Sequence, residues 1–165
     1  MLKAKEDLLN DLYNIIIECS QCLKLKGINQ WNPPYPKSLF LKDIKNGSIF
    51  YFKKDDEIVS TVTIYDRKPL YYPKDIWNDT YKCWYISRLA VSRKYKNKNY
   101  GRKILFEIET QAVEYGKERL RLDLIQSNPF LKKYYLNQGF KACYETEIFG
   151  QKVIFMEKHL KQDCL

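Results

Sequence analysis

Hydrophobic residues recur along the chain with two different periods. In the first, apolar positions return every three to four residues, which is typical of amphipathic helices. This pattern covers residues 7–24, 37–45, about 100–115 and 128–137. In the second, apolar residues alternate with polar ones or form short continuous runs, which predicts strands. This pattern covers residues 48–52, 58–65, 84–91, 120–126, 140–145 and 151–157, with a strand stub within residues 1–5.

The order of these segments predicts a mixed sheet. The strand at 84–91, the helix after it and the strand at 120–126 follow one another in the manner of a right-handed crossover, which makes the two strands parallel. The last two strands flank Phe149-Gly150 and are expected to form an antiparallel hairpin. We find no repeat or linker, and 165 residues suit a single domain, so we expect one domain over residues 1–165.

A cationic turn follows the strand at 84–91. Lys96, Lys98, Arg102 and Lys103 crowd this turn, and no carboxylate lies between Arg93 and Lys103. The next helix begins near Tyr100. Its first N–H groups have no partner within the helix, and the helix dipole favours negative charge there. A strand, a basic turn and a helix start in this order predict a phosphate site; a solvated surface loop is the alternative.

Two motifs resemble those of the GNAT family of N-acetyltransferases. The family's loop carries Gln or Arg, two residues, Gly, one residue, and Gly or Ala, and the corresponding residues here are Lys96-Asn97-Lys98-Asn99-Tyr100-Gly101. Lys96 can still donate to phosphate. Position 99 carries Asn, which tolerates a left-handed backbone better than any residue type except Gly. The second motif runs from Asn128 to Phe140, with Tyr135 four residues before Gly139.

The resemblance implies an α/β (α+β) acyltransferase fold. In this fold a mixed, mostly antiparallel sheet of about six to seven strands, with splayed central parallel strands, is flanked by about four helices. It also implies an acetyl-CoA-dependent N-acetyltransferase in which a primary amine attacks directly within a ternary complex. The acceptor is a small molecule or a peptide, and its identity is left open.

The family's functional residues can be carried over position by position. Backbone groups of the strand would bind the pantetheine arm, and the N–H near Val91 would polarise the acyl carbonyl. The basic turn would wrap the pyrophosphate, Asn128 would hydrogen-bond the pantetheine, and Tyr135 would act as general acid for the thiolate. The implied acetyl-CoA contacts are Leu89, Ala90, Val91, Lys96, Asn97, Lys98, Asn99, Tyr100, Gly101, Arg102, Asn128 and Tyr135.

The general base stays open. Many relatives place a carboxylate on the strand that corresponds to 84–91, and none lies there in this chain. Ser87 or Tyr85 could order a water, and Asp123 on the next strand is either a base or the acceptor of a structural hydrogen bond. Arg88 has an equally good interpretation as an ion-pair partner.

Two loops are candidates for the acceptor side. Residues 28–36 are interrupted by prolines and carry Trp31 and Tyr35, which either pack beneath the loop or form a wall of the acceptor site. Residues 66–82 form a long irregular segment with Tyr71, Tyr72 and Trp77, and loops of this length are usually functional or disordered. Acidic residues that could attract a cationic acceptor are Asp55, Asp56, Glu57, Asp66, Asp75 and Asp79.

Composition narrows the alternatives. A net charge of +9 suits a polyphosphate ligand, a nucleic acid or an anionic membrane, although general lysine enrichment explains part of it. We find no membrane span, signal peptide or nucleic-acid motif, so we expect cytoplasmic residence, no membrane partner and no nucleic-acid partner; a homodimer stays open. The five cysteines are expected to be reduced, and no metal site is expected. The alternatives to an enzyme are a non-catalytic acyl-CoA-binding module and, less favoured, a basic nucleic-acid-binding protein.

Overall fold

The computed structural model describes residues 1–160. Its strands are β1 (Leu2–Lys3), β2 (Ile49–Lys54), β3 (Glu57–Tyr65), β4 (Cys83–Val91), β5 (Arg119–Ile125), β6 (Lys141–Ile148) and β7 (Gln151–His159). Its helices are α1 (Leu9–Lys24), α2 (Lys37–Lys45), α3 (Tyr100–Glu114) and α4 (Pro129–Asn137), with short 3-10 helices η1 (Glu6–Leu8) and η2 (Arg93–Tyr95). The strands form a seven-stranded mixed sheet in the order β1-β2-β3-β4-β5-β7-β6, which confirms the predicted fold class.

The chain forms two compact units that interleave in sequence. Unit 1 contains residues 1–64 and 87–105, and unit 2 contains residues 65–86 and the chain from 106 onward. Both β4 and α3 therefore contribute one part to each unit. The expectation of a single domain stays a prediction.

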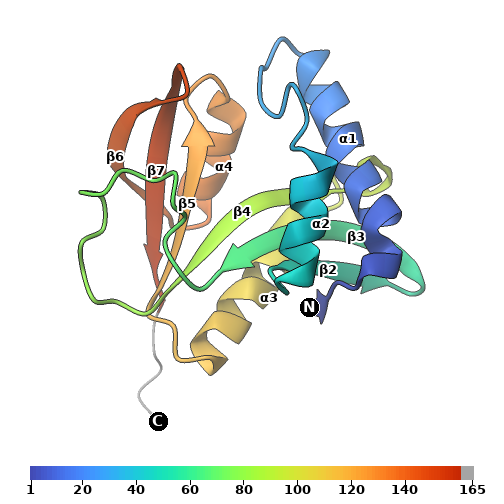
Figure 1. The fold of residues 1–165 in the computed structure, drawn as a ribbon, viewed down its shortest axis with the longest axis horizontal. Helices are drawn as coiled ribbons and strands as arrows, with labels where there is room; N and C mark the ends of the chain where they lie inside the picture. The colour runs from blue at the N-terminus through green and yellow to red at the C-terminus, as the bar shows by residue number, and fades with distance from the viewer. Residues whose placement is uncertain (161–165) are drawn as a thin grey trace. The chain divides into compact units, whose positions relative to one another are not determined.

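Unit 1 combines an antiparallel sheet with two helices. β1 pairs with β2, and β2 pairs with β3, with a register irregularity between Phe52 and Lys53. α1 and α2 pack beside each other over the strands (Figure 1), because each helix has one apolar face. Their buried side chains meet those of the strands in one core, whose members include Leu12, Ile16, Phe40, Ile44, Ile49 and Ala90.

Unit 2 is built around β5. The first residues of β4 pair with it in parallel, from Cys83 opposite Arg119 to Ile86 opposite Leu122, as the crossover rule predicts. β7 pairs with β5 in the antiparallel direction, and β6 and β7 form an antiparallel hairpin (Figure 1). A second core forms from the loop before β4 and from the strands, with Tyr72, Ile76, Cys83, Tyr85, Val153 and Phe155.

Two helices differ in how they begin. Asn128 caps α4, because its side chain accepts the Leu131 N–H at 3.2 Å and Pro129 holds the first helical position. Asp7, an acidic residue of the type that often caps a helix, does not cap α1. Asp7 lies inside η1, and α1 follows from Leu8 without a side-chain cap. None of the helices in residues 1–160 combines the length and apolar character needed to cross a membrane.

The cysteines that the structure describes are free thiols. Cys19 is buried on the apolar face of α1, and Cys22 is half-buried. Cys164 lies outside the described residues. Burial raises the pKa of the Cys19 thiol, which makes it a weak nucleophile.

Candidate active site

The end of β4 carries a left-handed residue. Arg88 has φ of +51°, an uncommon value for a residue other than Gly, and lies directly before Leu89, Ala90 and Val91. Its guanidinium donates to the Asp43 carboxylate at 2.7 Å and to Thr63 Oγ1 at 3.2 Å, and it stacks 3.9 Å from the centre of the Tyr35 ring. The interpretation of Arg88 as an ion-pair partner is confirmed.

The predicted pantetheine-binding residues follow this point. Ala90 is buried, and Leu89 and Val91 are half-buried. The Cys19 thiol donates to the Val91 carbonyl at 3.4 Å, which ties the strand end to α1. The strand end is thus held at Arg88 and at Val91.

The basic turn has the backbone of an anion site. Asn97 and Asn99 have φ of +61° and +59°, so Asn99 adopts the left-handed backbone that Asn tolerates. α3 begins at Tyr100, and its first i to i−4 hydrogen bond runs from Lys103 N–H to the Asn99 carbonyl at 3.2 Å. The N–H groups of Tyr100, Gly101 and Arg102 precede that bond and are oriented toward the start of the helix. Left-handed residues next to a helix start form a concave set of donors suited to phosphate.

The side chains of the turn add positive charge. Lys96, Lys98 and Arg102 are exposed, and within residues 1–160 none of them forms an ion pair with a carboxylate. Lys94, just before them, is different. It donates to Glu57 at 2.5 and 2.6 Å, and Glu57 also accepts the Tyr95 hydroxyl. Glu57 therefore fixes the base of the turn and leaves the charge of its tip available.

α4 presents the two residues of the second motif. Asn128 is buried, and its side-chain oxygen caps the helix. Tyr135 is also buried, with its ring 5.3 Å from that of Phe140 in a T-shaped contact. Burial raises the pKa of Tyr135, so the hydroxyl keeps its proton far above neutral pH. Its neighbour Tyr134 has a buried hydroxyl that makes no hydrogen bond within the described chain.

The first acceptor candidate is a packed loop. Trp31 and Tyr35 lie against the core of unit 1, which confirms the packing interpretation for both. The Tyr35 hydroxyl donates to Asp43 at 3.0 Å, and the backbone carbonyl of Tyr35 accepts a hydrogen bond from the Tyr13 hydroxyl at 2.8 Å. A role of this loop on the acceptor side stays a prediction.

The second acceptor candidate, residues 66–82, is irregular but well connected within unit 2. Lys68 Nζ donates to the carbonyls of Pro73, Lys74 and Ile76 at 3.4, 3.1 and 2.8 Å. At the start of the segment, Asp66 accepts from Lys117 and from the Trp84 indole, both at 2.7 Å. These contacts give the segment a defined conformation without regular secondary structure.

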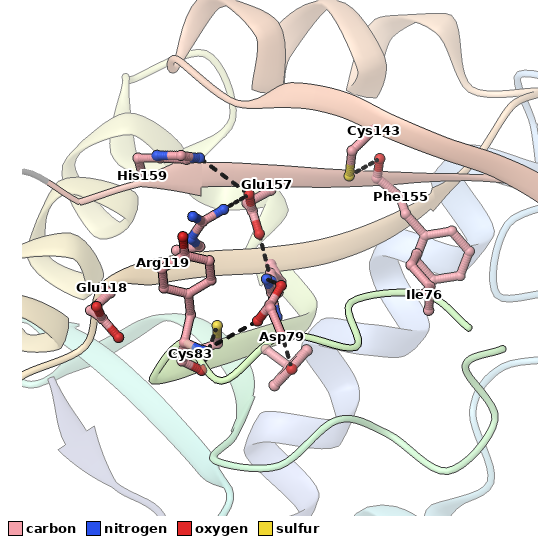
Figure 2. Close-up of polar contacts among 12 residues, drawn as sticks. Ile76, Asp79, Cys83, Glu118, Arg119, Cys143, Phe155, Glu157 and His159 are labelled. Carbon is pink, nitrogen blue, oxygen red and sulfur yellow. Dashed lines mark hydrogen bonds and ion pairs between the residues drawn. The ribbon is translucent and has the colours of Figure 1, made fainter. Parts of the chain in front are cut away.

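A buried arginine fastens the other end of this segment. Arg121 on β5 is 1% exposed, donates to Glu157 of β7 at 2.6 Å and forms an ion pair with Asp79. Its guanidinium also lies 4.8 Å from the centre of the Trp77 ring. Figure 2 shows Asp79 and Glu157 in this network, with Arg119 and His159 beside Glu157. Arg121 is not among the residues predicted from the sequence. The alternation in β5 nevertheless places Arg119, Arg121 and Asp123 on one face, which is a signal for buried ion pairs.

The base candidates have different partners. The Tyr85 hydroxyl accepts from Arg121 at 3.4 Å. Asp123 Oδ1 accepts the Tyr72 hydroxyl at 2.6 Å and the Tyr71 hydroxyl at 3.2 Å. The interpretation of Asp123 as the acceptor of a structural hydrogen bond is confirmed, and its role as a base stays a prediction. Ser87 is half-buried at the bend of β4.

The chain is similar to known proteins of one family. Residues 9–140 match the model of the acetyltransferase (GNAT) family. The chain is 29% identical over 133 residues to the uncharacterized N-acetyltransferase YesJ of Bacillus subtilis (strain 168), across 77% of this chain and 73% of YesJ. Its fold is similar to that of a GNAT acetyltransferase from Streptococcus agalactiae 2603, with a TM-score of 0.82 and 17% identity over 98% of this chain and 94% of that chain. It is also similar to a GNAT acetyltransferase from Listeria monocytogenes 4b F2365, with a TM-score of 0.78 and 21% identity over 95% of this chain and 92% of that chain.

Proposed function

Because this chain belongs to the acetyltransferase (GNAT) family, we propose that it transfers an acetyl group from acetyl-CoA to a primary amine by direct attack within a ternary complex. The observation that carries the proposal is the basic turn. Two left-handed asparagines, the start of α3 and three cations that no carboxylate of residues 1–160 neutralises are grouped there. Few ligands other than a polyphosphate match that set of donors and charges.

The residues of the turn fit the pyrophosphate of acetyl-CoA. Backbone N–H groups between Asn97 and Arg102 donate to its oxygens, and Lys96 and Lys98 add charge. The residue at position 99 has to adopt a positive backbone φ, which Asn does at low cost. The departures from the family motif at positions 96 and 99 therefore keep its physical function.

The rest of the donor substrate is assigned to β4 and α4. Backbone groups of Leu89, Ala90 and Val91 bind the pantetheine arm as a further strand, and the N–H near Val91 polarises the acyl carbonyl. Asn128 also contacts the pantetheine. Acetyl-CoA supplies an activated thioester, and the chain supplies orientation and hydrogen bonds.

Tyr135 is assigned as the general acid for the leaving thiolate. A hydroxyl that keeps its proton at neutral pH is available as a donor, and the raised pKa of Tyr135 supports that role. The thiolate of coenzyme A is a moderately good leaving group. We therefore expect Tyr135→Phe to lower kcat only about tenfold to a hundredfold.

The amine must lose a proton before or during the attack. A water held near Ser87 or Tyr85 and the Asp123 carboxylate are the two routes that the chain offers. The engagement of the Tyr85 hydroxyl by Arg121 favours Ser87 as the water-ordering residue. Comparison of Ser87→Ala with the wild type in the pH dependence of kcat/KM separates the two routes.

The first test is the thermal midpoint with and without acetyl-CoA. Ligand at about 100 times its dissociation constant adds roughly 2.7 kcal/mol of stability, which corresponds to several degrees. The variant with Lys98→Ala and Asn128→Ala should lose most of this rise. The variant Lys141→Ala, at an exposed residue of β6, serves as the matched control.

A rise in the midpoint justifies a screen of amines by mass spectrometry. Acetylated product establishes the enzyme, whereas binding without product from any amine favours the non-catalytic acyl-CoA-binding module. No rise at saturating ligand contradicts the proposal at its first step. Steeply salt-dependent binding to DNA or RNA would then favour the nucleic-acid-binding alternative.

A further inference from the structure

Two cysteines lie on α1, and one of them contacts the end of β4. Cys19 is 7% exposed, and its thiol donates to the Val91 carbonyl at 3.4 Å. Cys22 is half-buried in the last turn of the helix, which ends at Lys24. The proposed acetyl transfer uses the backbone of Val91 but neither thiol. A change at Cys19 would nevertheless reach the strand that binds the donor substrate.

The helix brings the two thiols close to each other. Residues at positions i and i+3 of a helix have Cα atoms about 5 Å apart, and a disulfide joins Cα atoms that are about 4.4–6.8 Å apart. Their Cβ atoms are about 5–6 Å apart, whereas a disulfide needs about 3.8 Å. Closure therefore requires a local tightening of α1. The last turn can provide it, because its carbonyls have no partners within the helix.

The surroundings of the thiols determine which one reacts first. Burial raises the pKa of the Cys19 thiol, and Arg93 opposes this shift through its charge and a hydrogen bond. A buried thiol reacts slowly with a reagent from solution, so the more accessible Cys22 reacts first. Cys19 then has to reach only its neighbour on the helix. Arg93 stabilises the Cys19 thiolate in that second step.

We propose that Cys19 and Cys22 form a redox-sensitive pair whose oxidation to a disulfide weakens the binding of acetyl-CoA. The oxidant is a low-molecular-weight disulfide. The Cys22 thiolate attacks one of its sulfurs and releases one thiolate, and the Cys19 thiolate then attacks the Cys22 sulfur and releases the other. The cysteines are oxidised, the reagent is reduced, and the two protons of the cysteines pass to the released thiolates. The effect on acetyl-CoA rests on the proposed acetyltransferase function.

The disulfide acts on the end of β4. Oxidised Cys19 has no S–H, so it cannot donate to the Val91 carbonyl, and its sulfur is drawn toward Cys22. β4 stays attached to β3, because the Ser92 N–H donates to the Val59 carbonyl at 2.8 Å. The change is therefore confined to how firmly the strand end is held against α1. Because acetyl-CoA binds to an ordered strand end, we expect its Kd to rise about threefold to tenfold, the range that one hydrogen bond covers.

The first measurement asks whether the disulfide forms. The full chain is incubated with glutathione disulfide or with dithiothreitol, alkylated and digested with trypsin, which releases both cysteines in the peptide 6–24. We expect glutathione disulfide to yield this peptide without alkylation and about 2 Da lighter than the free dithiol, and dithiothreitol to reverse the change. Glutathione retained on Cys22, or linkage of either thiol to another cysteine only, overturns the proposal.

The second measurement compares the Kd of acetyl-CoA for the reduced and the oxidised protein by titration calorimetry. Cys22→Ser cannot form the disulfide and keeps the contact of Cys19 with Val91, so its Kd should be the same in both conditions. Cys143→Ser, at an exposed cysteine of unit 2, is the control and should respond like the wild type. A disulfide that forms without raising Kd overturns the proposal. A rise in Kd that persists in Cys22→Ser also overturns it.

Substitutions of Cys19 test the route through Val91. In dithiothreitol, Cys19→Ala lacks the donor and should bind acetyl-CoA like the oxidised wild type, whereas Cys19→Ser keeps a donor and should bind more tightly than the Ala variant. Wild-type affinity in both variants overturns the proposal. If they do not fold, hydrogen exchange of residues 88–92 in the wild type decides, because oxidation should accelerate it and unchanged exchange overturns the proposal.

Failure of the proposed function gives a different result. If the reduced wild type does not bind acetyl-CoA, that function fails. Peptide mapping and hydrogen exchange then still decide whether the disulfide forms and loosens the end of β4, because neither measurement uses acetyl-CoA.

Discussion

Arg88 donates to the Asp43 carboxylate at 2.7 Å from a backbone position with φ of +51°. The two side chains are 8% and 12% exposed, so this ion pair joins β4 to α2 in the interior of unit 1. A left-handed arginine in a strand is unfavourable by itself. The contacts of its guanidinium compensate that cost, and they fix the direction in which Leu89, Ala90 and Val91 leave the bend.

Substitution of Arg88 separates the side-chain contribution from the backbone cost. Arg88→Ala leaves Asp43 buried without its cation and is expected to lower the free energy of unfolding by about 3–5 kcal/mol. Arg88→Gly loses the same ion pair but accepts positive φ, so it should be more stable than the Ala variant by about 1 kcal/mol. Urea denaturation measures both, and equal stability of the two variants would show that the backbone carries no strain.

Position 99 tests the backbone of the basic turn. Asn99→Val places a β-branched side chain at φ of +59°, which costs about 1–2 kcal/mol and should weaken acetyl-CoA binding by roughly tenfold. Asn99→Gly should bind like the wild type, because Gly adopts this conformation readily. Titration calorimetry with acetyl-CoA checks the pair. Unchanged affinity in the Val variant would mean that binding does not depend on the left-handed backbone.

The ion pair of Asp79 and Arg121 fastens the segment 66–82. Asp79→Asn removes the charge that holds the end of this segment, so we expect faster proteolytic cleavage within residues 66–82. Asp75→Asn, at an exposed residue of the same segment, is the control and should be cut at the wild-type rate. Limited proteolysis with mass spectrometry compares the two. Similar cleavage of both variants would assign the order of the segment to Lys68 and Asp66 instead.

The buried Tyr134 hydroxyl predicts a pH effect on stability. Burial and the nearby Glu109 charge raise the pKa of Tyr134 to about 12, above the value of about 10 in the unfolded chain. Its contribution to stability is therefore complete below pH 10 and is lost between about pH 10 and 12, because the unfolded state ionises first. In Tyr134→Phe, the free energy of unfolding should fall less steeply with pH over this range, by up to about 1.4 kcal/mol per pH unit.

Urea unfolding at about pH 8, 9.5 and 10.5 measures this difference in slope. At the lowest of these pH values, Tyr134→Phe should lower the free energy of unfolding only slightly, because the hydroxyl has no hydrogen-bond partner within residues 1–160. Tyr115→Phe, at an exposed tyrosine, should keep the wild-type slope. If the Tyr134 variant also keeps it, the Tyr134 hydroxyl is accessible to solvent.

The order of the elements was predictable from local patterns. Periodicity located the helices and most strand boundaries to within a few residues, because each element has one apolar face. Gly47 and Gly139 lie just after the ends of helices, and Asn128-Pro129 begins one. The exception was the start of α1, where an acidic residue available as a cap instead became part of a 3-10 turn.

The turn that we assign to phosphate is encoded locally. Lys96 to Arg102 are consecutive, so the conformation of the asparagines, the helix start and the cationic side chains all follow from local chemistry. The tertiary structure decided the partners of the charged residues. Arg88 and Asp43, Arg121 and Asp79, and Tyr72 and Asp123 are separated by 45, 42 and 51 positions. Pairing over such separations depends on strand register and on how the loops pack, which short-range periodicity does not encode.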